Sequence, residues 1–173
     1  MKNLTWSVGL IVAGLILLFG GCNTYNSLVN LDEDVENEWG KVQSAYQRRA
    51  DLVPQLLATV KGAAANEKEI LLKVTQARAG IVEAKTPDDL EIMGRKIETA
   101  INLAYEAYPQ IKSTENFQEF QKQLEGTENR VAQARRTYNE TVTDFNRAIR
   151  RFPRSIIAGI FGFEKRTLFE AAA

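Results

Sequence analysis

The sequence predicts an all-α fold: an elongated antiparallel up-and-down bundle of about four helices, preceded by an N-terminal membrane helix or lipoprotein signal. Apolar residues recur at steps of three and four along most of the chain, which is the spacing of one face of a helix. No window alternates apolar with polar residues, and the chain has no Asn-Gly or Asp-Gly pair, so we expect no strand or hairpin. A long uncharged stretch near the N-terminus predicts the membrane segment.

The uncharged stretch runs from Leu4 to Gly21, a length of 18 residues. A helix that spans the hydrocarbon core needs about 20 apolar residues, and the core of a signal peptide needs about 7 to 15. Residues 1–22 are therefore a retained transmembrane helix or a lipoprotein signal, with a buried core helix as a third interpretation. In a lipoprotein, Cys22 is the candidate lipidation site because the small Gly21 precedes it, although Phe19 stands where such signals usually have leucine.

The distribution of charge predicts the orientation of this segment. Lys2 is the only charged side chain before it, whereas five acidic residues follow between positions 32 and 38. Positively charged ends of membrane segments stay on the cytoplasmic side. We therefore expect a membrane-anchored protein whose bundle lies on the extracytoplasmic side, whether the segment is a helix or a signal.

The first bundle helix is predicted from Leu28 to Val60, about ten turns at 3.6 residues each. Its apolar residues form a narrow stripe, which predicts packing against another long helix. The stripe consists of Leu28, Leu31, Val35, Trp39, Val42, Tyr46, Val53, Leu56 and Val60. Because the stripe continues in phase beyond Pro54, we expect a kink near Asp51 to Pro54 and no break.

Three further helices complete the predicted bundle. After a turn at Gly62, helical spacing resumes from Glu67 to Ile81. Thr86 reads as an N-cap followed by a first-turn proline, so the next helix is predicted over 87–108. The longest apolar stripe extends from Phe117 to Phe152 and predicts a second helix of about ten turns, antiparallel to the first. Residues 23–152 are thus the predicted bundle.

The remaining segment, residues 153–173, differs in character from the bundle. From Arg147 onward the chain has six basic and two acidic residues, interleaved with aromatic and aliphatic side chains. Such a segment can lie in a membrane interface, and the candidate interface residues are Arg150, Arg151, Arg154 and Phe161. Alternatively, the apolar residues cap the open end of the bundle while the arginines complement a helix dipole.

The composition argues against most catalytic and binding chemistries. The chain has no histidine and one cysteine, which removes the commonest base and metal ligand. The balance of 22 basic and 22 acidic residues gives no field that would attract nucleic acid. No glycine-rich phosphate loop occurs. We therefore expect no enzyme activity, no cofactor, no metal, no small-molecule substrate and no nucleic-acid partner.

A charged group precedes the proline of the first long helix. Arg48, Arg49, Asp51 and Pro54 are candidates for a structural or partner-binding cluster. In the structural interpretation, Arg49 interrupts the apolar seam and pairs with a carboxylate, because an unpaired charge at such a position is costly.

A series of short motifs in this sequence resembles the LemA family. The motifs occur in the family's order along nearly the whole chain. They are Tyr25-Asn26-Ser27-Leu28-Val29, Gln47-Arg48-Arg49-Ala50-Asp51-Leu52-Val53-Pro54, Thr59-Val60-Lys61-Gly62, Glu106-Ala107-Tyr108-Pro109, Thr127-Glu128-Asn129-Arg130, Tyr138-Asn139, Phe145-Asn146, Phe152-Pro153 and Gly162-Phe163. The resemblance implies a bacterial membrane-associated helical bundle with an N-terminal membrane segment and no established catalytic activity.

These features predict a membrane-anchored scaffold or interaction protein that acts by helix-mediated self-association or by partner binding at the membrane. The alternative is a regulatory or sensory subunit of a membrane protease or transporter. The two shorter helices cover only part of the long seams, so we expect a second copy to bury the remainder and the protein to be a homo-oligomer. Membrane lipid and other membrane proteins are the remaining expected partners.

Overall fold

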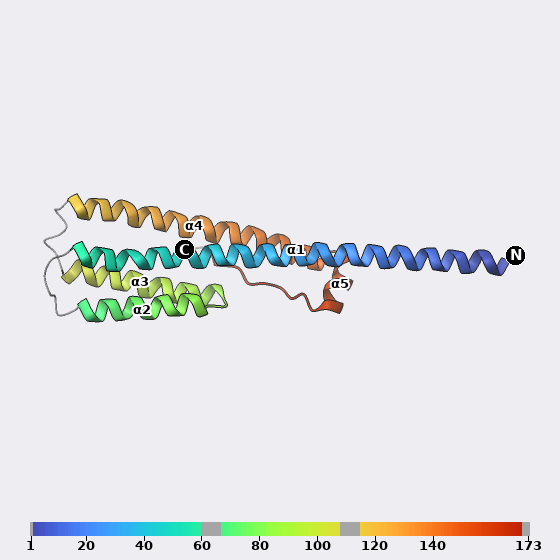
Figure 1. The fold of residues 1–173 in the computed structure, drawn as a ribbon, viewed down its shortest axis with the longest axis horizontal. Coiled ribbons are helices and arrows are strands. Elements are labelled where there is room, and N and C mark those ends of the chain that lie inside the picture. Colours follow the sequence, from blue (N-terminus) through green and yellow to red (C-terminus); the bar gives the residue numbers. More distant parts are fainter. Residues whose placement is uncertain (1, 60–66, 108–114, 171–173) are drawn as a thin grey trace. The chain divides into compact units, whose positions relative to one another are not determined.

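The computed structural model describes residues 2–59, 67–107 and 115–170, with side chains from residue 20 onward except those of 59, 67 and 116. Within these ranges the chain forms helices and no strand (Figure 1). The helices are α1 (Lys2–Thr59), α2 (Glu67–Glu83), α3 (Pro87–Ala107), α4 (Glu115–Arg150) and α5 (Arg154–Phe161). The predicted all-α class is confirmed, whereas the predicted turn at Gly62 lies outside the described residues.

The chain divides into two compact units, and α1 and α4 each contribute to both. The first unit consists of residues 1–37 and 140–166, and the second of residues 38–139 and 167–173. The boundary predicted at residue 22 falls inside α1, and the boundary predicted at residue 152 falls two positions after the end of α4.

The second unit is an antiparallel up-and-down bundle. On α1 and α4, Trp39 lies beside Tyr138 and Arg49 pairs with Glu128. Residue numbers therefore rise along α1 where they fall along α4, so the two helices are antiparallel. On α3 and α4, Arg135 contacts Glu91 at one level and Tyr105 lies beside Phe117 and Phe120 at another, with the same reversal of direction. Helices α2 and α3 lie side by side (Figure 1) and are joined by residues 84–86. The predicted arrangement of four helices is thus present in this unit.

The start of α3 shows how a short polar signal fixes a helix boundary. The Thr86 N–H donates to Asp89 Oδ2 over 3.0 Å, and the Asp89 N–H donates back to Thr86 Oγ1 over 3.2 Å. This reciprocal pair satisfies two backbone donors at the helix N-terminus. The hydrogen bonds from Thr86 and from the Lys85 N–H lower the pKa of the Asp89 carboxyl. Pro87 follows as the first residue of α3, so the predicted cap is confirmed.

The seams of the two long helices are buried within a single chain. The α1 stripe from Leu28 to Leu56 is buried except at Leu31 and Trp39, which are half-buried. The α4 stripe from Phe117 to Phe145 is likewise buried or half-buried. The described part of the chain therefore does not carry the uncovered seam that we expected a second copy to bury. Helix α1 also runs through Pro54 to Thr59, so the expected absence of a break is confirmed.

Close packing around Tyr46 explains a glycine in α3. A Cβ added at Gly94 would lie 2.7 Å from Cε1 of Tyr46, closer than two carbon atoms can pack. Gly94 itself is buried, so α3 approaches α1 at a distance that no larger residue allows. Burial raises the pKa of the Tyr46 hydroxyl, and the Arg135 guanidinium beside it offsets part of this rise.

The C-terminal end of α4 differs from the prediction. The helix ends at Arg150 and not at Phe152, which is exposed. Pro153 accounts for the difference, because a proline disfavours helical geometry in the residue before it and has no N–H to donate. The chain then turns into α5, a helix that the sequence analysis did not predict.

Helix α5 packs into the core of the first unit. Its Ala158 is buried with Leu28 of α1 and Ala148 of α4. Ile157 and Phe163 pack against this group. At the end of α5, Gly162 adopts the left-handed conformation (φ 75°), and the Phe163 N–H donates to the Ala158 carbonyl over 3.0 Å. This is the bond pattern of a glycine-terminated helix, and it directs Phe163 back onto the core.

The predicted membrane segment is described only in its backbone. No helix has, within its described side chains, an apolar stretch long enough to cross a membrane. Of Leu4 to Gly21, all but the last two residues lie outside those side chains. The backbone of α1 is helical from Lys2 onward.

Candidate functional site

Helix α5 lies against α1 immediately after the predicted membrane segment. A Cβ added at Gly21 would lie 3.9 Å from Cδ1 of Ile157. One turn further along α1, the ring of Tyr25 lies 4.5 Å from that of Phe161 and 6.0 Å from that of Phe163, measured between centroids. These contacts place α5 beside the last residues of the uncharged stretch and the first turn that follows it.

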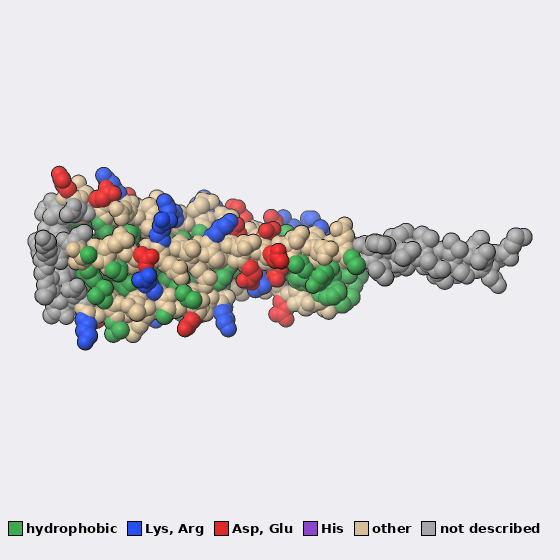
Figure 2. All heavy atoms as spheres, viewed as in Figure 1, with side chains coloured by type: hydrophobic (Ala, Val, Ile, Leu, Met, Phe, Trp, Pro, Cys, Tyr) green, Lys and Arg blue, Asp and Glu red, His purple; other side chains and the backbone are tan. Residues whose placement is uncertain are grey.

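Four apolar residues in α5 and just before it are exposed. Ile157, Ala158 and Phe163 supply the packed side. The exposed residues are Phe152 (81 %), Ile156 (54 %), Ile160 (69 %) and Phe161 (57 %), and we call them the α5 apolar surface. Figure 2 shows hydrophobic side chains gathered in the first unit near the first described side chains of α1. Exposed apolar clusters of this kind mark interaction sites.

Basic residues border the α5 apolar surface. Arg150 and Arg151 are exposed where α4 ends, and Arg154 is half-buried at the start of α5. None of the described carboxylates forms an ion pair with these three arginines, whereas Arg166 lies 3.0 Å from Asp32 and 2.9 Å from Glu36. The structure thus brings the predicted interface residues together on one short segment, with Phe161 at its end.

Cys22 is exposed on α1, next to Gly21. Its thiol therefore stands at the level where α5 meets α1. This position is compatible with either a lipid attached to Cys22 or an unmodified residue at the end of a membrane helix.

The charged group before Pro54 does not form a single cluster. Arg49 Nη2 lies 2.6 Å from Oε1 of Glu128 on α4, which is the carboxylate partner expected for it. Asp51 Oδ1 lies 2.9 Å from Nη2 of Arg78 on α2, an ion pair without the geometry of a directed hydrogen bond. Arg48 is exposed. These side chains tie α1 to two different helices, and partner binding by them stays a prediction.

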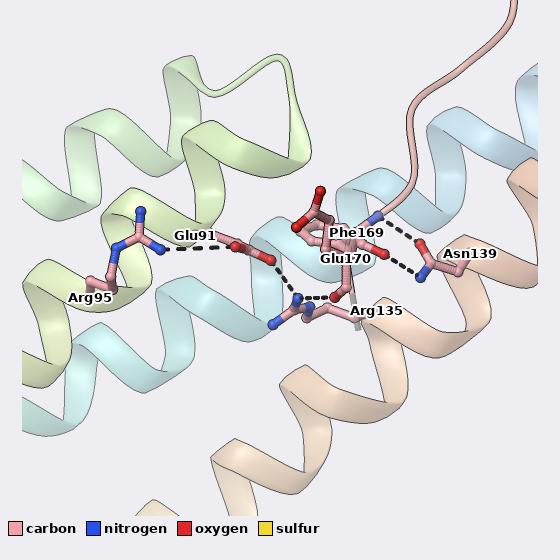
Figure 3. A network of polar contacts seen from close by, with 6 residues as sticks. All are labelled: Glu91, Arg95, Arg135, Asn139, Phe169 and Glu170. Atoms are coloured by element: carbon pink, nitrogen blue, oxygen red, sulfur yellow. Dashed lines mark hydrogen bonds and ion pairs between the residues drawn. The ribbon is translucent and has the colours of Figure 1, made fainter. Parts of the chain in front are cut away.

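A second site, unexpected from the sequence, holds the C-terminal segment in the second unit (Figure 3). Asn139 Nδ2 donates to the Phe169 carbonyl over 2.9 Å, and the Phe169 N–H donates to Asn139 Oδ1 over 2.9 Å. The Tyr138 hydroxyl donates to the Thr167 carbonyl over 3.1 Å, and Arg135 Nη2 donates to the Glu170 carbonyl over 3.1 Å. Three neighbouring residues of α4 therefore hold the main chain of this segment.

The Phe169 side chain fills the centre of this site. It is only 3 % exposed. Its ring centroid lies 6.0 Å from that of Trp39 in a stacked arrangement and 5.4 Å from that of Tyr138 in an edge-on arrangement. The Arg135 guanidinium lies 4.8 Å from the ring centroid, within the range of a cation–π contact. We call Trp39, Arg135, Tyr138 and Asn139 the Phe169 site.

Glu91 of α3 orients the arginine of the Phe169 site. Its Oε1 lies 2.5 Å from Arg135 Nη2, and its Oε2 lies 3.9 Å from Arg95 Nη1 (Figure 3). A carboxylate held between two guanidinium groups keeps Arg135 in place. Arg135 thus has a partner on α3 in addition to the segment that it binds.

In the first unit, a second asparagine of α4, seven residues further along, pairs with the main chain of one residue in the same way. Asn146 Nδ2 donates to the Arg166 carbonyl and the Arg166 N–H donates to Asn146 Oδ1, each over 2.9 Å. The binding role of both asparagines was not predicted from the sequence. A signal was present, because Asn139 and Asn146 stand seven residues apart inside a long helix, where asparagine is a poor helix former.

Within the described ranges, no group of three or more acidic or cysteine side chains is placed to hold a metal ion.

The comparisons with known proteins point to one family. A model of the LemA family matches residues 38–173. The chain is also similar to Protein LemA of Metamycoplasma hominis, with 25 % identity over 151 residues that cover 85 % of this chain and 69 % of that protein. The family model does not extend over residues 1–37, which include the predicted membrane segment.

Proposed function

We propose that this chain, which belongs to the LemA family, is a membrane-anchored, non-enzymatic scaffold. Residues 1–22 attach it to the bacterial cell membrane, either as a retained helix or through a lipid on Cys22. The α5 apolar surface rests in the membrane interface. The second unit is displayed on the extracytoplasmic side, where it associates with further copies and with other membrane proteins.

The observation that carries this proposal is the position of α5 on α1. Helix α5 contacts α1 at Gly21 and Tyr25, and four residues of helix correspond to about 6 Å along its axis. An interfacial helix buries its apolar face about 5–10 Å deep at the boundary between head groups and acyl chains. If Leu4 to Gly21 occupies the hydrocarbon core, the α5 apolar surface lies within that boundary.

The chemistry of the surface supports the same placement. Apolar side chains left in water cost about 25 cal/mol per Å² of exposed area, and the membrane interface removes this cost for Ile156, Ile160 and Phe161. Each basic residue near an anionic membrane contributes about 1 kcal/mol of attraction. Arg150 and Arg151 are exposed beside the apolar residues and are placed to contribute in this way.

The buried seams constrain how the scaffold associates. Since one chain covers its own stripes from Leu28 to Leu56 and from Phe117 to Phe145, we expect self-association to use other surfaces, namely the membrane segment, α5 or the C-terminal segment. A membrane tether confines copies to one plane and raises their effective concentration. Weak contacts between copies are then sufficient for assembly.

Fractionation and protease treatment test the anchor and its orientation. We expect the full chain, tagged after residue 173, to sediment with membranes, and we expect protease added to intact spheroplasts to digest the bundle. A cytoplasmic protein of the same cells serves as the control for spheroplast integrity. Recovery of the chain in the soluble fraction would contradict the anchor, and protection until lysis would contradict the orientation.

A further inference from the structure

We propose that the Phe169 site is a binding site for an extended peptide with an aromatic side chain, and that it accepts residues 167–170 of a second copy as well as its own. The inference deepens the proposed function and rests on it, because the tether to the membrane brings the copies together. It assigns to Trp39, Arg135, Tyr138 and Asn139 the recognition of a defined ligand class.

The polar contacts of the site recognise a main chain and not a particular sequence. Arg135, Tyr138 and Asn139 make four hydrogen bonds to main-chain atoms of residues 167–170, donating three and accepting one from the Phe169 N–H. An asparagine that pairs with both the N–H and the carbonyl of one residue satisfies the backbone as a neighbouring strand would. Thr167, Leu168 and Glu170 are exposed, so their side chains contribute little to selectivity.

Selectivity comes from the aromatic position. The ring of Phe169 is enclosed by Trp39, Tyr138 and Arg135. Aromatic pairs in such arrangements contribute beyond their buried area, and a guanidinium over the ring adds further attraction. An extended segment without an aromatic residue at this place would lack these ring contacts.

The site is built independently of its ligand. Glu91 holds Arg135 from α3, while Trp39 lies on α1 and Tyr138 and Asn139 lie on α4. All of these residues belong to the second unit, which the C-terminal segment joins only after Arg166. Residues 163–170 form no helix or strand of their own, so the segment depends on the site for its hydrogen bonds and the site does not depend on the segment for its framework.

Exchange between copies follows from this separation. A second copy offers the same segment to the same site, so every contact of the intramolecular arrangement is reproduced between two chains, as in domain swapping. The free energy of the intramolecular arrangement then differs from that of the exchanged arrangement only through the effective concentration of the segment at the site. Confinement to the membrane raises the concentration of the intermolecular ligand.

A labelled peptide tests the site on the full chain in mild detergent. The probe is a fluorescent peptide of residues 163–173, titrated into the Phe169→Ala chain, whose own segment has lost its anchor. We expect the Phe169→Ala chain to bind the probe at least about tenfold more tightly than the Phe169→Ala/Asn139→Leu chain, because the paired hydrogen bonds are lost. Asn129→Leu, an exposed asparagine of α4, is the matched control and should leave binding unchanged.

Two further variants keep this test independent of misfolding. In the Phe169→Ala chain, Asn139→Asp preserves the size of the side chain and the Oδ1 acceptor. We expect its affinity for the probe to lie between those of the Phe169→Ala chain and the Phe169→Ala/Asn139→Leu chain. A probe with alanine in place of Phe169 should bind to neither. Equal binding with and without the Asn139 amide, or equal binding of the alanine probe, would overturn the proposed site. An unrelated extended peptide that shares only the phenylalanine should bind about as tightly, because the contacts join main-chain atoms and one ring, and its failure to bind would overturn this assignment of the recognised features.

Complementation between two variants tests the exchange itself. The Phe169→Ala chain keeps the site and lacks the anchor, whereas the Asn139→Leu chain keeps the anchor and has a damaged site. We expect differently tagged samples of the two variants to form mixed complexes more readily than either variant forms complexes with itself. No preference for the mixed pair would overturn exchange. The membrane fractionation described above is unaffected by that outcome, so the two proposals fail separately.

Discussion

Replacement of Phe145 by alanine is expected to lower the free energy of unfolding by about 3–5 kcal/mol. Phe145 is fully buried in the first unit, where its ring lies 6.4 Å from that of Phe163. Removal of the ring leaves a cavity between α4 and the segment that follows α5. The measurement is denaturant unfolding of the full chain in mild detergent, followed by circular dichroism.

Phe152→Ala is the matched control for this prediction. The residue type is the same and the position is seven residues further along the chain, but Phe152 is exposed. We expect a change within about 0.5 kcal/mol, as for other surface substitutions. A loss of unfolding free energy for Phe152→Ala as large as that for Phe145→Ala would contradict the exposed position of the Phe152 ring.

The double substitution Leu10→Lys/Leu15→Lys is expected to move the protein from the membrane to the soluble fraction. A lysine near the centre of a membrane helix costs about 2.5–3.5 kcal/mol on insertion scales. Two of them offset most of the favourable transfer of an 18-residue segment. Quantitative blotting of sedimented and soluble fractions measures the effect.

Leu71→Lys/Leu72→Lys is the control for added charge. Both leucines are exposed on α2, so we expect the protein to remain with the membrane. Membrane association that survives the change at 10 and 15 would place the anchor elsewhere, with the α5 apolar surface as the next candidate.

The helices of the second unit could be predicted from sequence because local signals specify them. Periodic apolar residues fixed the faces of α1 and α4, and the pair of Thr86 and Pro87 fixed the start of α3 within one residue. The antiparallel direction of α1 and α4 followed from pairing two long apolar stripes in an up-and-down bundle. The end of α4 was misplaced by two residues because the apolar stripe continued to Phe152, whereas Pro153 determines where the helix ends.

The α5 helix and the Phe169 site could not be predicted in this way. Helix α5 has eight residues, too few for a periodic pattern to stand out. The Phe169 site depends on hydrogen bonds from α4 side chains to main-chain atoms. The spacing of Asn139 and Asn146 signals two such side chains, but the main-chain atoms that they bind carry no sequence signal. Only the ring of Phe169 has a recognisable side-chain role, and its partners Trp39 and Arg135 are distant in sequence.

Helix α5 and Phe163 after it cover apolar residues that we expected a second copy to bury at the ends of the long seams. In the first unit, Ile157, Ala158 and Phe163 provide that cover for Leu28 and Ala148. Exposed apolar residues of the first unit include those of the α5 apolar surface, for which we propose membrane lipid as the partner because α5 lies beside Gly21.

The position of the α5 apolar surface relative to the membrane can be measured with a single fluorophore. In a Cys22→Ser background, Ile160→Cys provides the only thiol of the chain and is labelled with an environment-sensitive dye. The full chain is reconstituted into vesicles that contain phosphatidylglycerol, and Leu72→Cys on α2 serves as the reference. We predict a blue-shifted emission at position 160 that lipid-borne quenchers reduce, and a water-like emission at position 72. Water-like emission at both positions, in vesicles that retain the protein, would contradict the placement of α5 in the membrane interface.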